Sequence, residues 1–405
     1  MTSLSPEAHW LLQRARRLAR SDAHDRLAPW PADWQQLHTL ARYHEVHPWL
    51  YRIALSAPPG TVLPTERTAI ERWWQFTTAR AFWQWEMLRA CVRALEAEGI
   101  AVIPLKGVVL GALVYGEPAL RPPGVDIDLL VPQRQWLAAA AMLERLGYRR
   151  ISAVVPSGAF LRHYKSAEFV RPGACVELHW TFVTPRPNPI DPAFAWQHAV
   201  RRRVDDEELL TLSWEDLLLT LAMHLRRHLQ SLRLKHLLDI ALLLRHHAAE
   251  MDWTYVWEAA RRLRIYRTLA YVLFLTRRVL EVSLPAAATG PLRSLGWRGA
   301  CWSRWAGFEL RWRFAAERRA MRWHDGMISL WKCLLMDSGF DMVRAGVKRA
   351  WWAWDERRLR PYRSVAAPHP PSPHDGAPGE QRQANKVPSP ESPRMAAQPV
   401  EPLAP

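Results

Sequence analysis

The chain has 405 residues, of which 49% are hydrophobic and 23% charged, and this balance excludes a protein that is disordered throughout. Its formal net charge of +16 comes mostly from arginine, the side chain that binds phosphate through two parallel hydrogen bonds. The charge fits a polyanionic partner, although arginines also commonly cover solvated helix faces. The length predicts two domains, or one large domain with a tail.

The four cysteines lie far apart, at Cys91, Cys175, Cys301 and Cys333. They form neither CxxC pairs nor a dense framework, so we expect no structural zinc site and no disulfide scaffold. This usage fits the reducing cytoplasm, and the charged first twenty residues do not resemble a secretory signal. No apolar run reaches the roughly 18 to 20 residues that a membrane-spanning helix needs. We therefore expect a cytoplasmic protein.

Residues 1–99 form the first predicted region, in which apolar residues recur three and four positions apart, as they do in helices. Gly99 follows the last of these helices as a C-terminal cap. After Gly99 the spacing of the apolar residues changes. Residues 100–105 (IAVIPL) are a short apolar run that predicts a buried strand, and residues 106–115 resume a helical pattern.

Residues 100–185 are predicted to form a compact mixed α/β unit. Its later elements follow in chain order: a loop at 116–124, a strand at 125–131, a helix at 133–146, and strands at 148–154, 163–170 and 175–182. The turn-forming residues 171–173 join the last two strands into a hairpin.

The third predicted region comprises residues 186–363. A proline-rich connector at 185–192 leads into it, and it is helical from about Trp214. Ser213 is placed to cap the first of its helices, with Asp216 in the acidic first turn.

Two segments near the C-terminus have unusual compositions. Tryptophan and arginine alternate through residues 297–354; they could stack on bases or lie at a lipid headgroup layer, or the tryptophans could simply fill a helical core. Residues 364–405 contain eleven prolines and no aromatic residue, which predicts a disordered tail. The predicted fold class is therefore α+β, with a small mixed-sheet domain between helical N-terminal and C-terminal regions.

Three acidic side chains stand out in the α/β unit. Asp126 and Asp128 lie two apart on a predicted strand, so both carboxylates project from one face. Two like charges this close favour a shared cation, and hard oxygen ligands suit Mg²⁺ or Mn²⁺. Glu177 is a third acid, flanked by apolar residues on another predicted strand. The simpler alternative is that all three pair with nearby arginines on the surface.

The turn at Lys106 and Gly107 is a second candidate element. Gly107 allows backbone N–H groups at a helix start to approach a phosphate, and Lys106 adds a positive charge there. The pair predicts a triphosphate cradle, although Lys106 could also simply end a strand at solvent. His179 shares the strand face of Glu177, where it could bind phosphate, orient the glutamate, or serve as a structural histidine packed by Trp180.

The segment IPLKGVVLGALVYGEPALRPPGVDIDLLV, followed after a helix and a hairpin by VELHW, resembles the bacterial family of uncharacterised nucleotidyltransferases. The resemblance runs from about residue 40 to 280 and includes LAMHLRRHLQSLRLKHLLDIALLL. It implies a DNA polymerase β-like fold, a divalent metal held by Asp126, Asp128 and Glu177, and a nucleoside triphosphate, with ATP expected. The sequence departs from the superfamily in having Lys106-Gly107 where Gly-Ser or Gly-Gly is usual.

The resemblance also implies roles for residues outside the acidic trio. Lys106, Gly107, Arg121 and His179 would bind the nucleotide, although an extra residue between Arg121 and Asp126 leaves the placement of Arg121 open. His224 and Asp239 would contact the acceptor. His224 and His228 also have the i, i+4 spacing of zinc ligands, but no third ligand can be named, and such a pair more often packs or faces solvent.

The leading functional hypothesis is a metal-dependent nucleotidyltransferase that acts on a small molecule, a peptide or a protein. One alternative is a catalytically silent basic domain that binds nucleic acid, with an affinity that falls steeply with salt. Another is a phosphotransferase accessory in peptide or polysaccharide biosynthesis. The sequence predicts no transmembrane segment under any of these hypotheses.

Overall fold

The computed structural model describes residues 4–20, 30, 33–151, 164–182, 191–293, 301–302, 304–305 and 335. The chain divides into two units, Met1–Ser364 and Val365–Pro405, and all described residues belong to the first. The predicted disordered tail, and nearly all of the tryptophan-rich and arginine-rich stretch, lie outside the described residues. The four regions expected from the sequence remain predictions.

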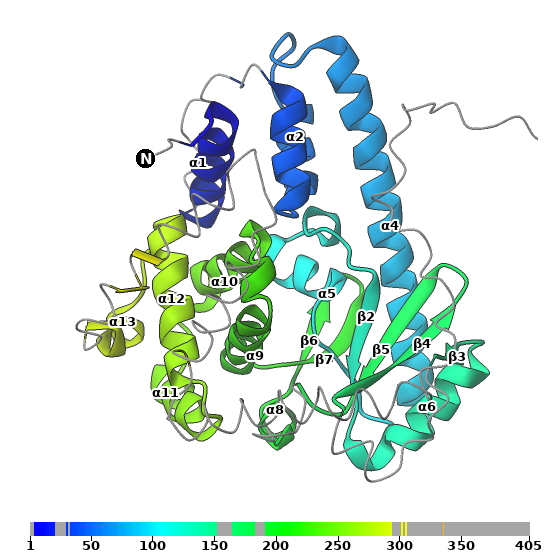
Figure 1. The fold of residues 1–405 in the computed structure, drawn as a ribbon. Helices are drawn as coiled ribbons and strands as arrows, with labels where there is room; N and C mark the ends of the chain where they lie inside the picture. The colour runs from blue at the N-terminus through cyan, green and yellow to red at the C-terminus, as the bar shows by residue number, and fades with distance from the viewer. Residues whose placement is uncertain are drawn as a thin grey trace, which may run out of the picture. The chain divides into compact units, whose positions relative to one another are not determined.

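The described part of the chain is mostly helical and contains one mixed sheet, which confirms the predicted α+β class (Figure 1). Four helices precede the sheet: α1 (Pro6–Arg20), α2 (Trp34–Tyr43), α3 (His47–Leu55) and α4 (Pro64–Ala97). The sheet strands are β1 (Ile103–Pro104), β2 (Asp126–Leu130), β3 (Arg149–Arg150), β4 (Ser166–Arg171) and β5 (Ala174–His179). Their spatial order is β1-β2-β5-β4-β3, with β2 and β5 parallel and the other neighbours antiparallel.

Several shorter elements link these strands. Between β1 and β2 lie α5 (Val108–Leu110), a π-helical turn (Gly111–Tyr115) and a 3₁₀ turn (Pro118–Leu120); between β2 and β3 lie a 3₁₀ turn (Gln133–Gln135) and α6 (Trp136–Arg145). The continuous helix expected at 106–115 is thus a short α-helix that widens into a π-turn. Gly111 permits this packing, because a Cβ there would lie 2.8 Å from the carbonyl oxygen of Pro118.

The sheet has one apolar face and one polar face. Ile127, Leu129, Val176, Leu178 and Phe169 alternate along their strands and pack in one core with residues of α4 and α6. Because side chains alternate across a strand, the intervening positions of β2 and β5, which include Asp128 and Glu177, project from the opposite face. The hydrophobic pattern of the strands therefore determines where the acidic residues point.

The second half of the described chain begins with α8 (Ala193–Gln197) and a hairpin, β6 (Val200–Val204) and β7 (Glu207–Thr211). The sequence analysis did not identify this hairpin. Its two-residue turn contains no glycine, and Asp205 adopts the left-handed conformation with a φ of 57°. Arg89 of α4 holds the turn region through ion pairs with Asp206 and Glu207.

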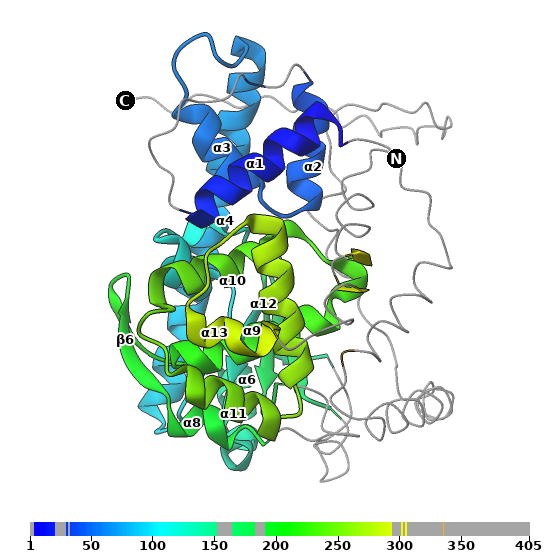
Figure 2. The ribbon, with the colours of Figure 1, turned by 90° about the vertical axis from the view of Figure 1, so that its left-hand side faces the viewer.

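The remaining helices are α9 (Trp214–Arg227), α10 (Leu234–His247), α11 (Trp253–Arg262), α12 (Tyr266–Leu280) and α13 (Ala286–Arg293), with a 3₁₀ turn at Leu229–Ser231. Ser213 caps α9 as expected, because its hydroxyl accepts a hydrogen bond from the Asp216 amide. Helix α9 contacts α10, α11 and α12, α12 also contacts α10 and α11, and α1 packs against α10 and α12 (Figure 2). Leu130 of β2 and Ile103 of β1 join the core of these helices.

Candidate active site

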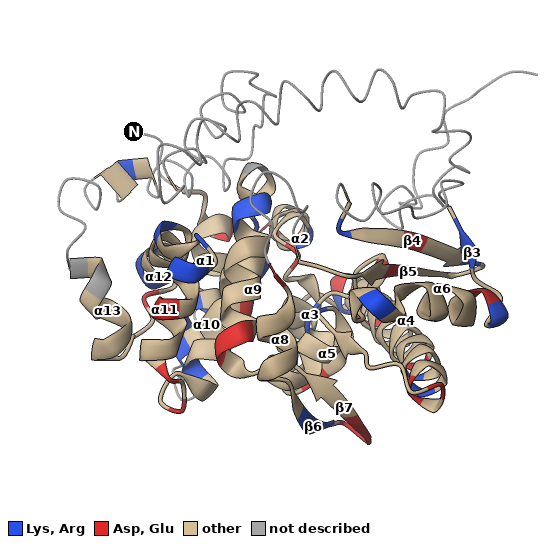
Figure 3. Ribbon diagram, turned by 90° about the horizontal axis from the view of Figure 1, so that it is seen from below, with Lys and Arg blue, Asp and Glu red and all other residues tan. Residues whose placement is uncertain are grey.

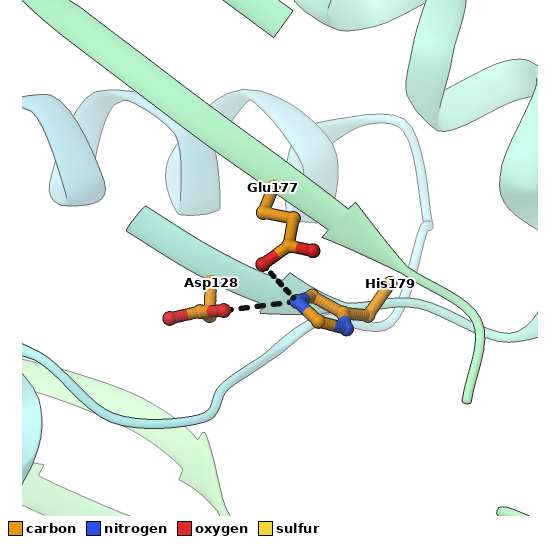
Figure 4. Close-up of side chains that lie close together, drawn as sticks. All are labelled: Asp128, Glu177 and His179. Atoms are coloured by element: carbon orange, nitrogen blue, oxygen red, sulfur yellow. Dashed lines mark hydrogen bonds and ion pairs between the residues drawn. The ribbon is translucent and has the colours of Figure 1, made fainter. Parts of the chain in front are cut away.

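Asp128 and Glu177 are direct neighbours on the parallel strands β2 and β5. Their carboxylate oxygens and a ring nitrogen of His179 lie within 4.8 Å of one another (Figure 4). Within the described ranges, no other group of His, Cys, Asp or Glu meets this criterion for a metal site. The structure therefore brings together two of the three predicted metal ligands, and adds His179 to them.

His179 bridges the two carboxylates. Its Nε2 lies 2.9 Å from Asp128 Oδ1 and 3.2 Å from Glu177 Oε2, and the ring is 3% exposed. Burial lowers the pKa of His179, but the hydrogen bonds to Asp128 and Glu177 outweigh it, so the net pKa is raised. Nδ1 of the same ring is buried and has no hydrogen-bond partner among the described residues. The ring thus contacts Glu177, as it would if it oriented the glutamate, and that role stays a prediction.

Two lysines complete the ion pairs of the site. Lys106 Nζ lies 2.8 Å from Asp128 Oδ2, and Lys165 Nζ lies 2.6 Å from Glu177 Oε1. Ser166 Oγ donates a further hydrogen bond to the same oxygen of Glu177. Although burial alone would raise the pKa of Asp128 and of Glu177, these partners together with His179 hold both pKa values below their usual range.

Asp126 differs from the other two acids. It begins β2 and is not one of the three clustered ligand residues. Burial and the nearby charge of Asp128 raise its pKa, against the opposing pull of Lys106. The loop that precedes it is held by α4, since Arg80 and Gln84 both donate to the carbonyl oxygen of Gly124. Asp126 is thus a carboxylate whose charge is poorly compensated at the edge of the cluster.

Gly107 forms the expected turn between β1 and α5. Its φ of 71° and ψ of −136° suit glycine, because a Cβ would strain this backbone. No heavy atom lies within 4 Å of where a Cβ would stand, so the turn is open on that side. The turn therefore has the geometry expected of a close approach by a ligand to the backbone.

Arg121 and Asp239, for which the sequence analysis expected separate roles, form a buried ion pair with each other. The guanidinium binds both oxygens of Asp239 on α10, with Nε at 2.9 Å and Nη2 at 3.0 Å. Tyr115 donates to Asp239 Oδ1 at 2.9 Å, and Arg121 Nη1 reaches the Gly107 carbonyl oxygen at 3.4 Å. Asp239 is 1% and Arg121 5% exposed. This buried pair ties the Gly107 turn to α10.

His224 lies near the site, on α9. Burial lowers its pKa well below the usual value, and the charge of Lys106 adds to this effect, so the ring is neutral. Its ring centroid lies 4.3 Å from that of His228 and 5.6 Å from that of His236. The three imidazoles form a cluster, but their ring nitrogens do not meet the 4.8 Å criterion that the carboxylate oxygens of Asp128 and Glu177 and the ring nitrogen of His179 meet.

The sequence analysis missed Lys165 and Ser166. Lys165 immediately precedes β4 and Ser166 is its first residue. Nothing in their local sequence pattern distinguishes them from other strand residues. Strand register could have identified Ser166, because the tight turn at 171–173 fixes the hairpin and places Ser166 opposite His179. Lys165 precedes Ser166, and its carbonyl oxygen accepts a hydrogen bond from the amide of Trp180.

The mixed sheet presents carboxylates from adjoining parallel strands, beside a glycine turn at a helix start, and this arrangement fits a protein of the nucleotidyltransferase class. The chain belongs to the uncharacterised nucleotidyltransferase family, whose model matches residues 31–281, well over half of its length. The family and the enzyme class predicted from the sequence are thereby confirmed.

Two solved structures of the antibiotic-resistance factor ANT(2'')-Ia are similar to the chain. A solution structure has a TM-score of 0.34 and 15% identity, covering 44% of this chain and 91% of the other. A crystal structure of the complex with adenylyl-2''-tobramycin has a TM-score of 0.27 and 16% identity, covering 40% and 98%. No curated protein matches the chain. None of the helices in the described ranges is long and apolar enough to cross a bilayer.

Proposed function

We propose that the chain transfers a nucleotidyl group from a nucleoside triphosphate, with ATP as the expected donor, to a hydroxyl-bearing acceptor in a reaction that needs Mg²⁺ or Mn²⁺. The observation that carries the proposal is the direct pairing of Asp128 with Glu177 on parallel strands, with His179 bridging them. The acceptor is a small molecule, a peptide or a protein, and we expect the reaction to take place in the cytoplasm.

The donor set fits a hard divalent cation. Carboxylate oxygens are the ligands that Mg²⁺ and Mn²⁺ prefer, and Asp128 and Glu177 offer theirs within 4.8 Å of each other. Asp126, on the same strand face as Asp128, would add a third carboxylate, and a cation would offset the burial and the repulsion from Asp128 that raise its pKa. When bound, the metal would neutralise the triphosphate and activate the acceptor hydroxyl.

The other residues of the site have separate roles in the proposal. The open backbone at Gly107 and the ammonium of Lys106 bind phosphate oxygens. Arg121 acts through the turn, since it holds the Gly107 carbonyl while engaged with Asp239. His179 fixes the orientation of Glu177. His224 and Asp239 lie on the helices next to the site, and the neutral ring of His224 is suited to a hydrogen bond with the acceptor.

The positive net charge of the protein supports nucleic-acid binding less strongly than the acidic cluster supports metal-dependent transfer. Basic positions lie on several separate elements, among them β3 and β6 (Figure 3). Arg201 on β6 pairs with Glu96, and Arg89 beside the hairpin pairs with Glu207. The acidic cluster has no role in binding a polyanion, whereas metal-dependent transfer requires it.

Nucleotide binding tests the proposal. We expect the full chain to bind a non-hydrolysable ATP analogue at least about tenfold more tightly with Mg²⁺ than without it, because the metal bridges carboxylates and phosphates. The Asp126→Ala/Asp128→Ala variant should lose this difference. Isothermal titration calorimetry measures both affinities, with Arg145→Met, which removes a surface ion pair to Glu98, as the control. Identical affinities for wild type and the double variant would rule out the proposal.

A further inference from the structure

Every carboxylate oxygen of Asp128 and Glu177 already contacts a basic side chain. Asp128 is shared between Lys106 and His179, and Glu177 between Lys165 and His179. Each carboxylate oxygen has a second lone pair, so a divalent cation that binds these oxygens competes with the basic side chains and adds positive charge beside them. Lys165 is the one of these basic side chains to which the sequence analysis assigned no role.

Lys165 is well placed to act on Glu177 alone. Its Nζ lies 2.6 Å from Glu177 Oε1, and its side chain is 12% exposed. Its backbone is fixed to the end of β5, because its carbonyl oxygen accepts hydrogen bonds from the amides of Trp180 at 3.0 Å and Thr181 at 3.4 Å. The backbone is thus anchored while the four-carbon stem can still carry the ammonium to a different partner.

Displacing this ammonium without giving it a new anion is costly. Removing one partner of a buried ion pair leaves an uncompensated charge in a poorly solvated position. A divalent ion without a nucleotide brings further positive charge next to Glu177, and it gives the Lys165 ammonium no new anionic partner. A triphosphate brings anionic oxygens, with which a lysine forms strong charge-assisted hydrogen bonds.

We propose that Lys165 is a positioning residue that withholds Glu177 from a divalent cation until a triphosphate draws its ammonium away. Glu177 then becomes a metal ligand only when the nucleotide is present, and the displaced lysine binds a phosphate oxygen. This inference rests on the proposed function, and it explains why a residue outside the acidic trio pairs with the glutamate at so short a distance.

Mn²⁺ binding to the full chain, followed by electron paramagnetic resonance without any nucleotide, tests the inference. We expect Lys165→Met and Lys165→Gln to bind Mn²⁺ about tenfold more tightly than wild type, since Glu177 is released. Both variants should bind a non-hydrolysable triphosphate more weakly in calorimetry. Lys165→Arg, which keeps the charge, should stay close to wild type in both measurements.

Two controls separate this effect from a general change in charge or packing. Arg145→Met and Arg201→Met each remove one positive charge from an ion pair outside the site, with Glu98 at 3.0 Å and with Glu96 at 3.1 Å respectively. Neither should raise the Mn²⁺ affinity. Unchanged Mn²⁺ affinity in both Lys165 variants would overturn the inference while leaving the proposed function intact. A wild-type protein that binds neither Mn²⁺ nor triphosphate would overturn both.

Discussion

Asp126→Asn should stabilise the folded protein at neutral pH and at the same time remove its Mg²⁺-dependent activity. Burial and the charge of Asp128 raise the pKa of Asp126 above its value in the unfolded chain. The folded state therefore binds a proton more tightly, so stability decreases as the pH rises through this range, and the ionised carboxylate is a cost at pH 7. A neutral amide of the same shape removes that cost.

Asp128→Asn should have the opposite effect on stability. The pKa of Asp128 is lowered, because Lys106 and His179 outweigh the effect of burial, so the carboxylate stabilises the fold at pH 7. The variant leaves Lys106 without its anion and His179 with Glu177 as its remaining acidic partner among the described residues, and should cost about 3 kcal/mol. Both variants remove a carboxylate of the proposed metal site, for which we expect a loss of rate on the order of 10³-fold.

Urea unfolding at pH 7 and transfer from a labelled triphosphate measure these two effects separately. The expected pattern is loss of activity in both variants, with stability raised in Asp126→Asn and lowered in Asp128→Asn. Equal destabilisation of the two would show that Asp126 is compensated as well as Asp128. Full activity in either variant would exclude that residue from the metal site.

Arg121→Met is expected to have the largest effect on stability, a loss of about 3 to 5 kcal/mol, because it leaves a buried carboxylate without its cation. Asp239 is 1% exposed, and among the described residues Tyr115 would remain as its one hydrogen-bond partner. Loss of the pair also frees the Gly107 turn from α10, so the variant should bind nucleotide more weakly wherever it stays folded.

A double-mutant cycle measures this pair directly. Arg121→Met/Asp239→Leu should recover most of the stability that Arg121→Met loses, since no unpaired buried charge remains. Arg145→Met, whose pair with Glu98 is more than half exposed, should change the free energy of unfolding by at most about 1 kcal/mol. Additive losses in the double variant would mean that the two side chains act independently.

The parts of the site that depend on local pattern could be predicted from the sequence. Strict alternation at Asp126 to Asp128 predicted a strand with both carboxylates on one face, and β2 spans Asp126–Leu130. Gly99 adopts a positive φ just after a helix, as its position after an apolar periodic segment indicated. The apolar residues that flank Glu177 indicated an acid on a second strand, and the structure shows that it pairs with Asp128.

The contacts that depend on long-range geometry could not be predicted. Arg121 and Asp239 are 118 positions apart, and each was assigned a ligand of its own because periodicity says nothing about which side chains meet. The β6–β7 hairpin was not predicted, because its strands are rich in arginine and glutamate and its turn lacks glycine. Lys165 carries no local signal at all; only its ion pair with Glu177 reveals it.

A crystal structure of the full chain with Mg²⁺ and a non-hydrolysable triphosphate is the most direct test of the central claim, that Asp128 and Glu177 form one metal site beside the Gly107 turn. We expect a metal bound to oxygens of both carboxylates, phosphates against the Gly107 backbone, and Lys165 turned from Glu177 to a phosphate. A triphosphate bound elsewhere, with both carboxylates still paired to their lysines, would contradict the account.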